Sequence, residues 1–198
     1  MNHNPAKAAA FDEIESFDDL ESVGAGMRII ITPLQEITPD KGKINIKVKV
    51  LSLWNQYYSN NHSSKLSGID MILMDEQGTK IHATINSSIV CDFDTLLKEN
   101  DYQIISNFNV KRNVDSTKLT KHEFKIQFYK KTNVRSCSEF SCNDDGMNFI
   151  SFKDFVEGKI DQSYSFDVIG RLIQNKDITV LNPNNAPKHI LEFQLYKL

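Results

Sequence analysis

Basic side chains alternate with apolar ones in two segments of the chain. Lys47 and Lys49 stand on the opposite parity to the apolar residues around them, and so do Lys80 and His82. Successive side chains of an extended strand point to opposite faces, so each segment predicts a strand with an apolar inner face and a basic outer face. Such a face on two strands could follow a phosphate backbone and release counterions. An ordinary solvated face is the alternative.

Three aromatic residues, Trp54, Tyr57 and Tyr58, follow the first of these strands. An amphipathic ring at a strand end can stay accessible and stack on bases, which is worth about 1–3 kcal/mol per base. A core tryptophan with two loop tyrosines packed against it is the alternative. Further basic residues bracket a later polar loop, where they would either contact phosphate or only solubilise the loop; they are Lys111, Arg112, Lys118 and Lys121.

The basic residues are concentrated in the middle of an acidic chain. The 198 residues include 23 Lys and Arg against 26 Asp and Glu. Residues 43–131 alone carry 13 basic and 9 acidic side chains, a balance of +4, whereas 1–42 has a balance of −5 and 132–198 of −2. A local positive balance is what a polyanion-binding surface requires.

The same middle segment contains the elements of one small barrel. Apolar alternation predicts strands near 44–54, 69–74, 80–85, 102–108 and 124–128, with polar loops at 56–67 and 114–121. The alternation slips at Val50-Leu51, which indicates a bulge. Residues 87–98 space Ile89, Val90, Phe93, Leu96 and Leu97 as a helix does. The predicted fold is all-β, a five-stranded OB-fold barrel with one capping helix, followed by an incomplete second OB-like segment.

The barrel has flanking segments on both sides. We expect 1–26 to be an acidic, disordered leader, 27–131 the OB-fold domain, 132–148 a linker and 149–198 a truncated second OB-like domain. The last segment shows strand patterns but too few of them to close a barrel.

Several function classes lack their sequence signals. There is no Gly-rich phosphate loop, no nucleophile elbow and no His-Glu metal pattern, so we predict neither an enzyme nor a cofactor. Cys137 and Cys142 lack a second ligand pair and are expected to be free thiols without zinc, while Cys91 is expected to be buried on the helix. Asp75-Glu76 is assigned to a hairpin turn. No run of about 20 apolar residues predicts a membrane span.

Four stretches of the chain resemble the large-subunit DNA-binding domains of replication protein A, most closely the plant-type replication-protein-A-like group. They are INIKVKVLSLW (44–54), MILMDEQGTKIHATI (71–85), YQIISNFNV (102–110) and FISFKDFVEGKIDQSYSFDVIGRLI (149–173). The resemblance implies non-catalytic single-stranded DNA binding in DNA replication, repair or recombination in the nucleus. It also makes other replication protein A subunits candidate partners. RNA stays open as a ligand.

Two positions depart from the family pattern. The family's stacking aromatics stand near the start of strand two and just after the Ala-Thr of strand three, where this chain has Ile69 and Asn86. The Trp54 cluster is the expected substitute. The predicted interface consists of Lys47, Lys49, Trp54, Tyr57, Tyr58, Lys80, His82, Asn86, Lys111, Arg112 and Lys121. The alternative is a protein-interaction OB module that has lost nucleic-acid binding.

Overall fold

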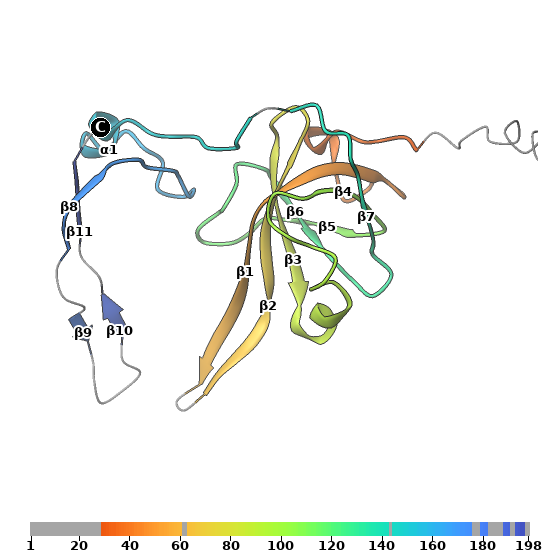
Figure 1. Ribbon diagram of the computed structural model, residues 1–198, viewed down its shortest axis with the longest axis horizontal. Helices are drawn as coiled ribbons and strands as arrows, with labels where there is room; N and C mark the ends of the chain where they lie inside the picture. The colour runs from red at the N-terminus through yellow and green to blue at the C-terminus, as the bar shows by residue number, and fades with distance from the viewer. Residues whose placement is uncertain are drawn as a thin grey trace, which may run out of the picture.

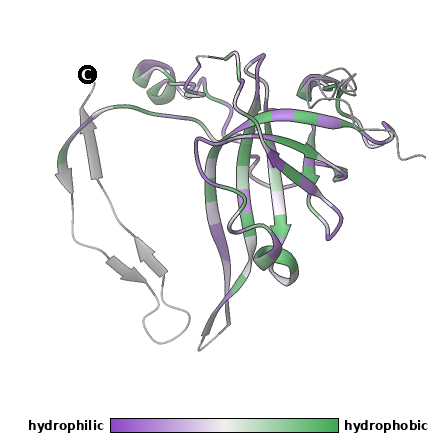
Figure 2. Cartoon of the chain, turned by 45° about the vertical axis from the view of Figure 1, so that its right-hand side comes forward, coloured by the Kyte–Doolittle hydropathy of each residue, from purple (hydrophilic) through white to green (hydrophobic). Residues whose placement is uncertain are grey.

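Alternating residues form one curled sheet in the computed structural model, which describes residues 29–60, 63–142, 144–175, 179–181, 188–190 and 193–196 (Figure 1). The strands are banded green and purple in Figure 2, as apolar–polar alternation requires. Their order is β5-β6-β3-β2-β1-β4-β7, and only β3 and β6 pair in parallel. Their bounds are β1 Asn45–Asn60, β2 Ser63–Asp75, β3 Lys80–Asn86, β4 Tyr102–Ser106, β5 Asn109–Arg112, β6 Phe124–Gln127 and β7 Asn133–Ser136. The predicted leader, 1–26, lies outside the described residues.

The sheet closes into a barrel because β4 and β5 follow each other as the two parts of one sharply bent strand. β4 pairs with β1 near one end of the strand order, and β5 pairs with β6 at the other end. Asn107, between them, has a φ of +55°, a left-handed conformation that asparagine tolerates better than most residues. Thr132 Oγ1 donates a hydrogen bond of 2.8 Å to the Asn107 carbonyl and holds the bend. The predicted all-β OB class is confirmed, with strand four divided in two and β7 added.

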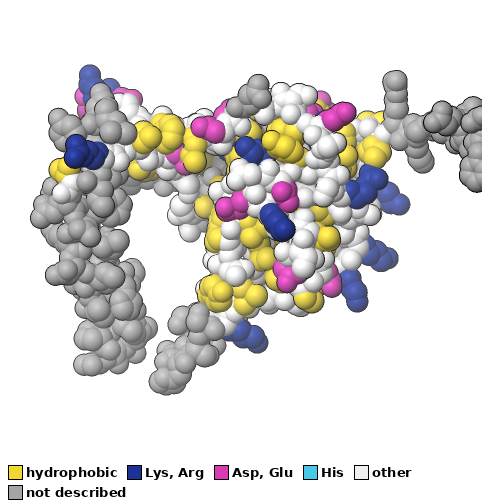
Figure 3. All heavy atoms as spheres, in the orientation of Figure 1, with side chains coloured by type: hydrophobic (Ala, Val, Ile, Leu, Met, Phe, Trp, Pro, Cys, Tyr) yellow, Lys and Arg dark blue, Asp and Glu magenta, His cyan; other side chains and the backbone are white. Residues whose placement is uncertain are grey.

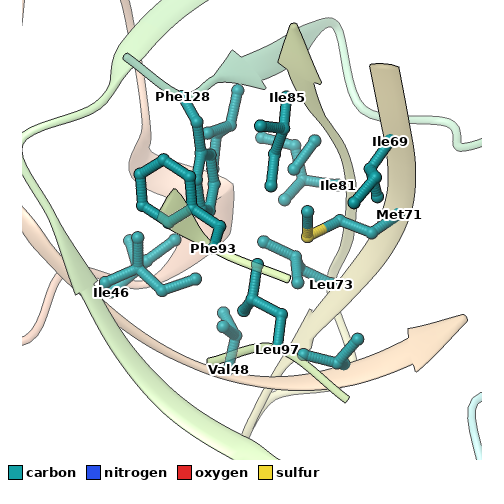
Figure 4. Close-up of a cluster of buried hydrophobic side chains, with 14 of the residues drawn as sticks. Ile46, Val48, Ile69, Met71, Leu73, Ile81, Ile85, Phe93, Leu97 and Phe128 are labelled. Atoms are coloured by element: carbon teal, nitrogen blue, oxygen red, sulfur yellow. The ribbon is translucent and has the colours of Figure 1, made fainter. Parts of the chain in front are cut away.

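The core lies inside the barrel, where the inward residues of the strands meet (Figure 4). Phe128 is 2% exposed, and its ring meets Phe93 edge to face at 5.3 Å between centroids. The inward parities of the apolar residues predicted for the first and third strands are confirmed. The strand residues that are fully buried include Ile46, Val48, Val50, Met71, Leu73, Ile81, Ala83, Ile105 and Ile126.

The predicted helix over 87–98 is wrong in its extent. A 3-10 helix, η3 (Ser87–Asp92), is followed by turns that bury Phe93 and Leu97. Asn86 accepts a hydrogen bond from the Ser88 amide, which starts a tight turn there. Because side chains of a short 3-10 segment do not follow the 3.6-residue period, Cys91 is exposed rather than buried.

One inward position of β4 holds a polar side chain. Gln103 and Ile105 are buried in β4, and Gln103 Nε2 donates to the Leu96 carbonyl at 3.2 Å. That bond explains how a polar side chain can take an inward position. Phe108, beyond the bend, still packs half-buried against the core.

The predicted polar loop at 56–67 is instead a long ribbon. β1 and β2 stay paired as far as Asn60 and Ser63 and project together beyond the barrel in Figure 1. Backbone hydrogen bonds hold a ladder whatever the side chains, which is why an Asn- and Ser-rich segment can remain extended. The register shifts between Val50 and Ser52, confirming the predicted bulge.

The hairpin turn between β2 and β3 is confirmed. Gly78 has a φ of +80°, which favours glycine. The buried Asp75 carboxylate accepts hydrogen bonds from the amides of Gln77 and Thr79 at 3.1 and 2.9 Å, and from the Leu34 amide at 2.8 Å. It therefore organises the turn and anchors the 3-10 segment η2 (Leu34–Glu36) to the barrel.

The chain beyond the barrel contains short elements. β7 lies within the predicted linker 132–148 and pairs with β4. The helix α1 (Phe152–Val156) begins at Ser151, whose hydroxyl accepts from the Lys153 amide. Two antiparallel pairs follow: β8 (Arg171–Asn175) with β11 (Phe193–Tyr196), and β9 (Thr179–Leu181) with β10 (Lys188–Ile190). None of the helices described is long and apolar enough to cross a bilayer.

Candidate nucleic-acid interface

Cross-strand pairing aligns the outward side chains of the barrel in three rows. We call them the tryptophan row, the histidine row and the lysine row, and together they form the outer face. The tryptophan row contains Trp54, Asp70, Thr84, Gln127 and Asn109. The histidine row contains Ser52, Ile72, His82, Lys125 and Lys111. The lysine row contains Lys80, Met74, Lys49 and Tyr102. Met74 has the outward parity but is fully buried.

A groove of about 1060 Å³ lies on this outer face. Its lining combines Ser52, Ile72 and Lys80 with loop residues 119–124 and with residues 145–150 and 165–167 of the segment after β7. The groove therefore joins parts of the barrel face to a loop and to a later segment of the chain.

The loop between β5 and β6, residues 113–123, is tied to the later segment by its own backbone. The Lys118 amide donates to the Ser163 carbonyl at 2.9 Å, and the Ser165 amide donates to the Lys118 carbonyl at 2.8 Å. The Lys118 ammonium also lies 5.5 Å from the centre of the Tyr164 ring, within reach of a cation–π contact. Both sides of the groove are thereby held together.

The structure separates the predicted aromatic cluster. Trp54 stands in the tryptophan row and is half-buried. Tyr57 faces the other side of the ribbon, where its hydroxyl lies 3.4 Å from Asn55 Nδ2. Tyr58 shares the parity of Trp54 and is 44% exposed. Trp54 and Tyr58 can therefore act on one face, and Tyr57 cannot join them there.

The predicted basic residues divide into free and paired groups. Among the described residues, Lys49, Lys80, Lys111 and Lys121 form no salt bridge. Arg112 is paired with Glu123 at 2.7 Å, both largely exposed. The side chain of His82, for which a phosphate contact is predicted, is only 4% exposed. Asn86 is exposed but serves as the cap of η3.

Lys47 is held in an ion pair, with its Nζ 2.9 Å from Glu76 Oε1. The hydrogen bond from Lys47 holds the pKa of the Glu76 carboxyl below its ordinary value, and the Ser141 amide, which donates to the same oxygen, lowers it further. The hydrogen bond to Glu76 likewise raises the pKa of Lys47. At neutral pH this lysine is therefore already neutralised by a carboxylate.

Replacing Glu76 by glutamine is expected to lower the free energy of unfolding near pH 7 by at most about 1 kcal/mol. The contribution of Glu76 is lost as the pH falls through its lowered pKa, and that of Lys47 as the pH rises through its raised pKa. The difference between wild type and Glu76→Gln should thus be largest near neutrality and shrink towards both acid and alkali. Urea unfolding across this pH range measures it; a difference that grew towards acid would contradict the assignment.

Sequence reasoning missed several residues of the outer face and the side chains that hold them. Tyr102 ends the lysine row, and its ring is stacked on Phe140 with centroids 4.8 Å apart and planes 9° from parallel. Asp115 in loop 113–123 holds Lys125 at 2.7 Å, and Gln56 Nε2 donates to Asp70 at 2.9 Å. Lys125 stands between the apolar Phe124 and Ile126, so its outward parity can be predicted from the sequence. Its partner Asp115 cannot, because the loop that carries it has no periodicity.

Charges of both signs therefore lie close together over β1–β3, while Lys and Arg gather at the edge of the barrel on the right of Figure 3.

In the described part of the chain, no group of three or more His, Cys, Asp or Glu side chains could hold a metal ion.

The chain was compared with protein families, curated proteins and solved structures. Residues 35–158 match the family described as Domain of unknown function DUF223. None of the curated proteins matches the chain. The chain is similar to one from a replication protein A heterotrimer bound to ssDNA, with a TM-score of 0.60 and 22% identity over 83% of this chain and 38% of that chain. It thus spans about 38% of that relative's length.

Two further solved structures are similar at lower TM-scores. One is DNA binding domain A of S. cerevisiae replication protein A, with a TM-score of 0.42 and 18% identity over 55% of this chain and 95% of that chain. The other is a hypothetical protein from Arabidopsis thaliana, with a TM-score of 0.40 and 13% identity over 72% and 90% of the two chains. The family match covers more than half of this chain, and the chain therefore belongs to the DUF223 family, with the OB fold of replication-protein-A-like domains.

Proposed function

We propose that the chain binds single-stranded DNA along its outer face, without catalysis, in nuclear DNA replication, repair or recombination. The observation that carries the proposal is the placement of Trp54, Lys49 and Lys80 on one face of an OB barrel, beside the groove. OB domains bind single strands by combining a basic face with stacking rings. The solved relative with the same fold is a heterotrimer bound to ssDNA, which supports the choice of ligand and makes other replication protein A subunits candidate partners.

The geometry supports sequence-tolerant binding of modest strength. Trp54 and Tyr58 offer π-faces, which stack on every base, and Lys49 and Lys80 carry charge that is not paired within the described residues. Ile69, at a family stacking position, is 4% exposed and cannot substitute for a ring. With few stacking platforms on one barrel, we expect a dissociation constant of about micromolar order.

Fluorescence anisotropy of a labelled oligo-dT of about 20 nucleotides tests the proposal at two salt concentrations. Saturable binding that weakens as salt rises is the expected result, and the same titration with oligo-rU tests RNA as the ligand. Absence of binding at low salt and tens of micromolar protein would contradict the proposal.

Lys49→Ala and Lys80→Ala should each flatten the salt dependence of binding. Each phosphate contact to a single strand contributes about 0.7 to the slope of log affinity against log salt, so each variant should lose about that amount. Lys98→Ala is the matched control, because Lys98 is exposed in the connection between η3 and β4 and belongs to none of the three rows. Equal slopes for all three variants would place the phosphate path elsewhere.

A protein-interaction role is the second candidate, and the ion pairs of the outer face favour it. Glu76, Asp115 and Glu123 neutralise Lys47, Lys125 and Arg112. Their carboxylates lower the attraction for phosphate. In this case the barrel would show no affinity for oligo-dT in the titration above.

A further inference from the structure

His82 lies in the middle of the outer face with a carboxylate at each ring nitrogen. Its Nε2 is 3.6 Å from Asp70 Oδ2 and its Nδ1 is 3.8 Å from Asp115 Oδ2. The side chain is 4% exposed, and neither nitrogen has a hydrogen-bond partner among the residues that the structure describes. Buried polar atoms are almost always hydrogen-bonded, so an imidazole with two unpartnered nitrogens asks for an explanation.

The protonation state of the ring decides whether this arrangement can be satisfied. A neutral imidazole has one N–H donor and one lone pair, whereas carboxylates only accept. One nitrogen of neutral His82 must therefore direct its lone pair at an anion. An imidazolium has two donors and a positive charge, and it matches both carboxylates at once.

The two carboxylates belong to different parts of the candidate interface. Asp70 is on β2 in the tryptophan row, next to Trp54 in register and held by Gln56. Asp115 is in loop 113–123, whose residues 119–123 line the groove. A bond through His82 would therefore fasten the loop to the face of the barrel.

We propose that His82 is a proton-operated latch: protonation bridges Asp70 and Asp115, draws loop 113–123 onto the barrel face and strengthens nucleic-acid binding there. His82 acts as a positioning residue and does not touch the ligand. The effect on binding rests on the proposed function, whereas the latch itself does not. A proton added to the His82 ring would close the latch, and a lower pH favours its addition.

The other charged group beside His82 is Lys125, its register partner on β6. Lys125 Nζ binds both oxygens of Asp115 at 2.7 and 2.8 Å, so Asp115 is already held near the histidine row. Protonated His82 would bring a second cation to the same carboxylate and a first to Asp70. Before protonation two carboxylates face one ammonium, and after protonation they face two cations. The repulsion of an incoming phosphate therefore falls.

NMR of the free protein tests the latch without any ligand. We expect the backbone amides of loop 113–123 and of Asp70 to shift with pH together with the His82 ring signals. Glutamine keeps polar atoms but cannot take the proton, so His82→Gln should abolish the coupled shift. Asp115→Asn retains His82 but removes its carboxylate partner in the loop, so it should abolish the pH-dependent shift of the loop amides. This second variant tests the latch even if His82→Gln fails to fold. Loop amides that ignore the His82 titration in the wild type would overturn the proposal.

Anisotropy with oligo-dT of about 20 nucleotides at pH 7.5 and pH 5.5 tests the consequence for binding. The wild type should bind about threefold to tenfold more tightly at the lower pH, the effect of one added charge near a phosphate. His122→Gln is the control, since the neutral His122 ring is satisfied by donating from Nε2 to the Leu34 carbonyl and accepting at Nδ1 from the Phe124 amide, and the variant should keep the pH effect. If His82→Gln keeps the whole effect, the proposal is wrong. Coupled loop shifts with no binding at either pH would reject the proposed function and leave the latch standing.

Discussion

Replacing Trp54 with alanine is expected to weaken binding of oligo-dT by about 5-fold to 150-fold. Stacking on one aromatic side chain is worth about 1–3 kcal/mol per base, and each 1.4 kcal/mol is tenfold in affinity. Trp54 is the largest ring on the outer face and stands in register with Asp70 and Thr84, above the middle of the sheet. Fluorescence anisotropy at constant salt measures the loss.

Tyr57→Ala is the matched control for this variant. Tyr57 lies three residues away in the same strand and is 57% exposed, more than Tyr58, yet it faces the other side of the ribbon. We expect its removal to leave the affinity within about twofold of wild type, since it cannot meet a ligand bound on the outer face. Equal losses for Trp54→Ala and Tyr57→Ala would show that binding does not use the outer face.

Replacing Phe128 with alanine is expected to lower the free energy of unfolding by about 3–5 kcal/mol, the usual cost of removing a buried phenylalanine ring. Phe128 is 2% exposed and packs edge to face on Phe93, which plugs the barrel after η3. The loss therefore includes the transfer of the ring, the cavity left behind and an aromatic contact. Urea or guanidinium unfolding monitored by circular dichroism measures it.

Phe155→Ala is the control for the loss of a phenylalanine as such. Phe155 is on α1 and is 49% exposed, with its ring 5.6 Å from that of Phe166. Substitutions at exposed positions usually change stability by about 0.5 kcal/mol or less. A loss below about 1 kcal/mol for Phe128→Ala would mean that Phe128 is not part of a packed core.

The predictions from sequence were confirmed where a local period is tied to burial. From Asn45 to Val50 in β1, and throughout β3, every second residue is apolar and buried, so Lys47, Lys49 and Lys80 had to face outward. His82 has the outward parity of β3 but is buried as well. The turn at Gly78 is confirmed for a related reason, since its positive φ favours glycine.

Other features failed because the deciding interaction comes from a distant residue. Gln103 is buried in β4, where it donates a hydrogen bond to the Leu96 carbonyl, and no pattern within the strand predicts that contact. The segment 56–67 is polar and resembles a loop, but backbone pairing between β1 and β2 keeps it extended.

The all-β class, the basic middle segment and the outward parity of Lys47, Lys49 and Lys80 could all be predicted from the amino-acid sequence, because they follow from composition and from the two-residue period of a strand. Which of those charges are free depends on contacts made in the folded chain. Glu76 reaches Lys47 from the next hairpin, and Asp70 and Asp115 come from two elements to enclose His82. The state of a charged group depends on its neighbours in space, and strand pairing brings these neighbours together from separate parts of the chain.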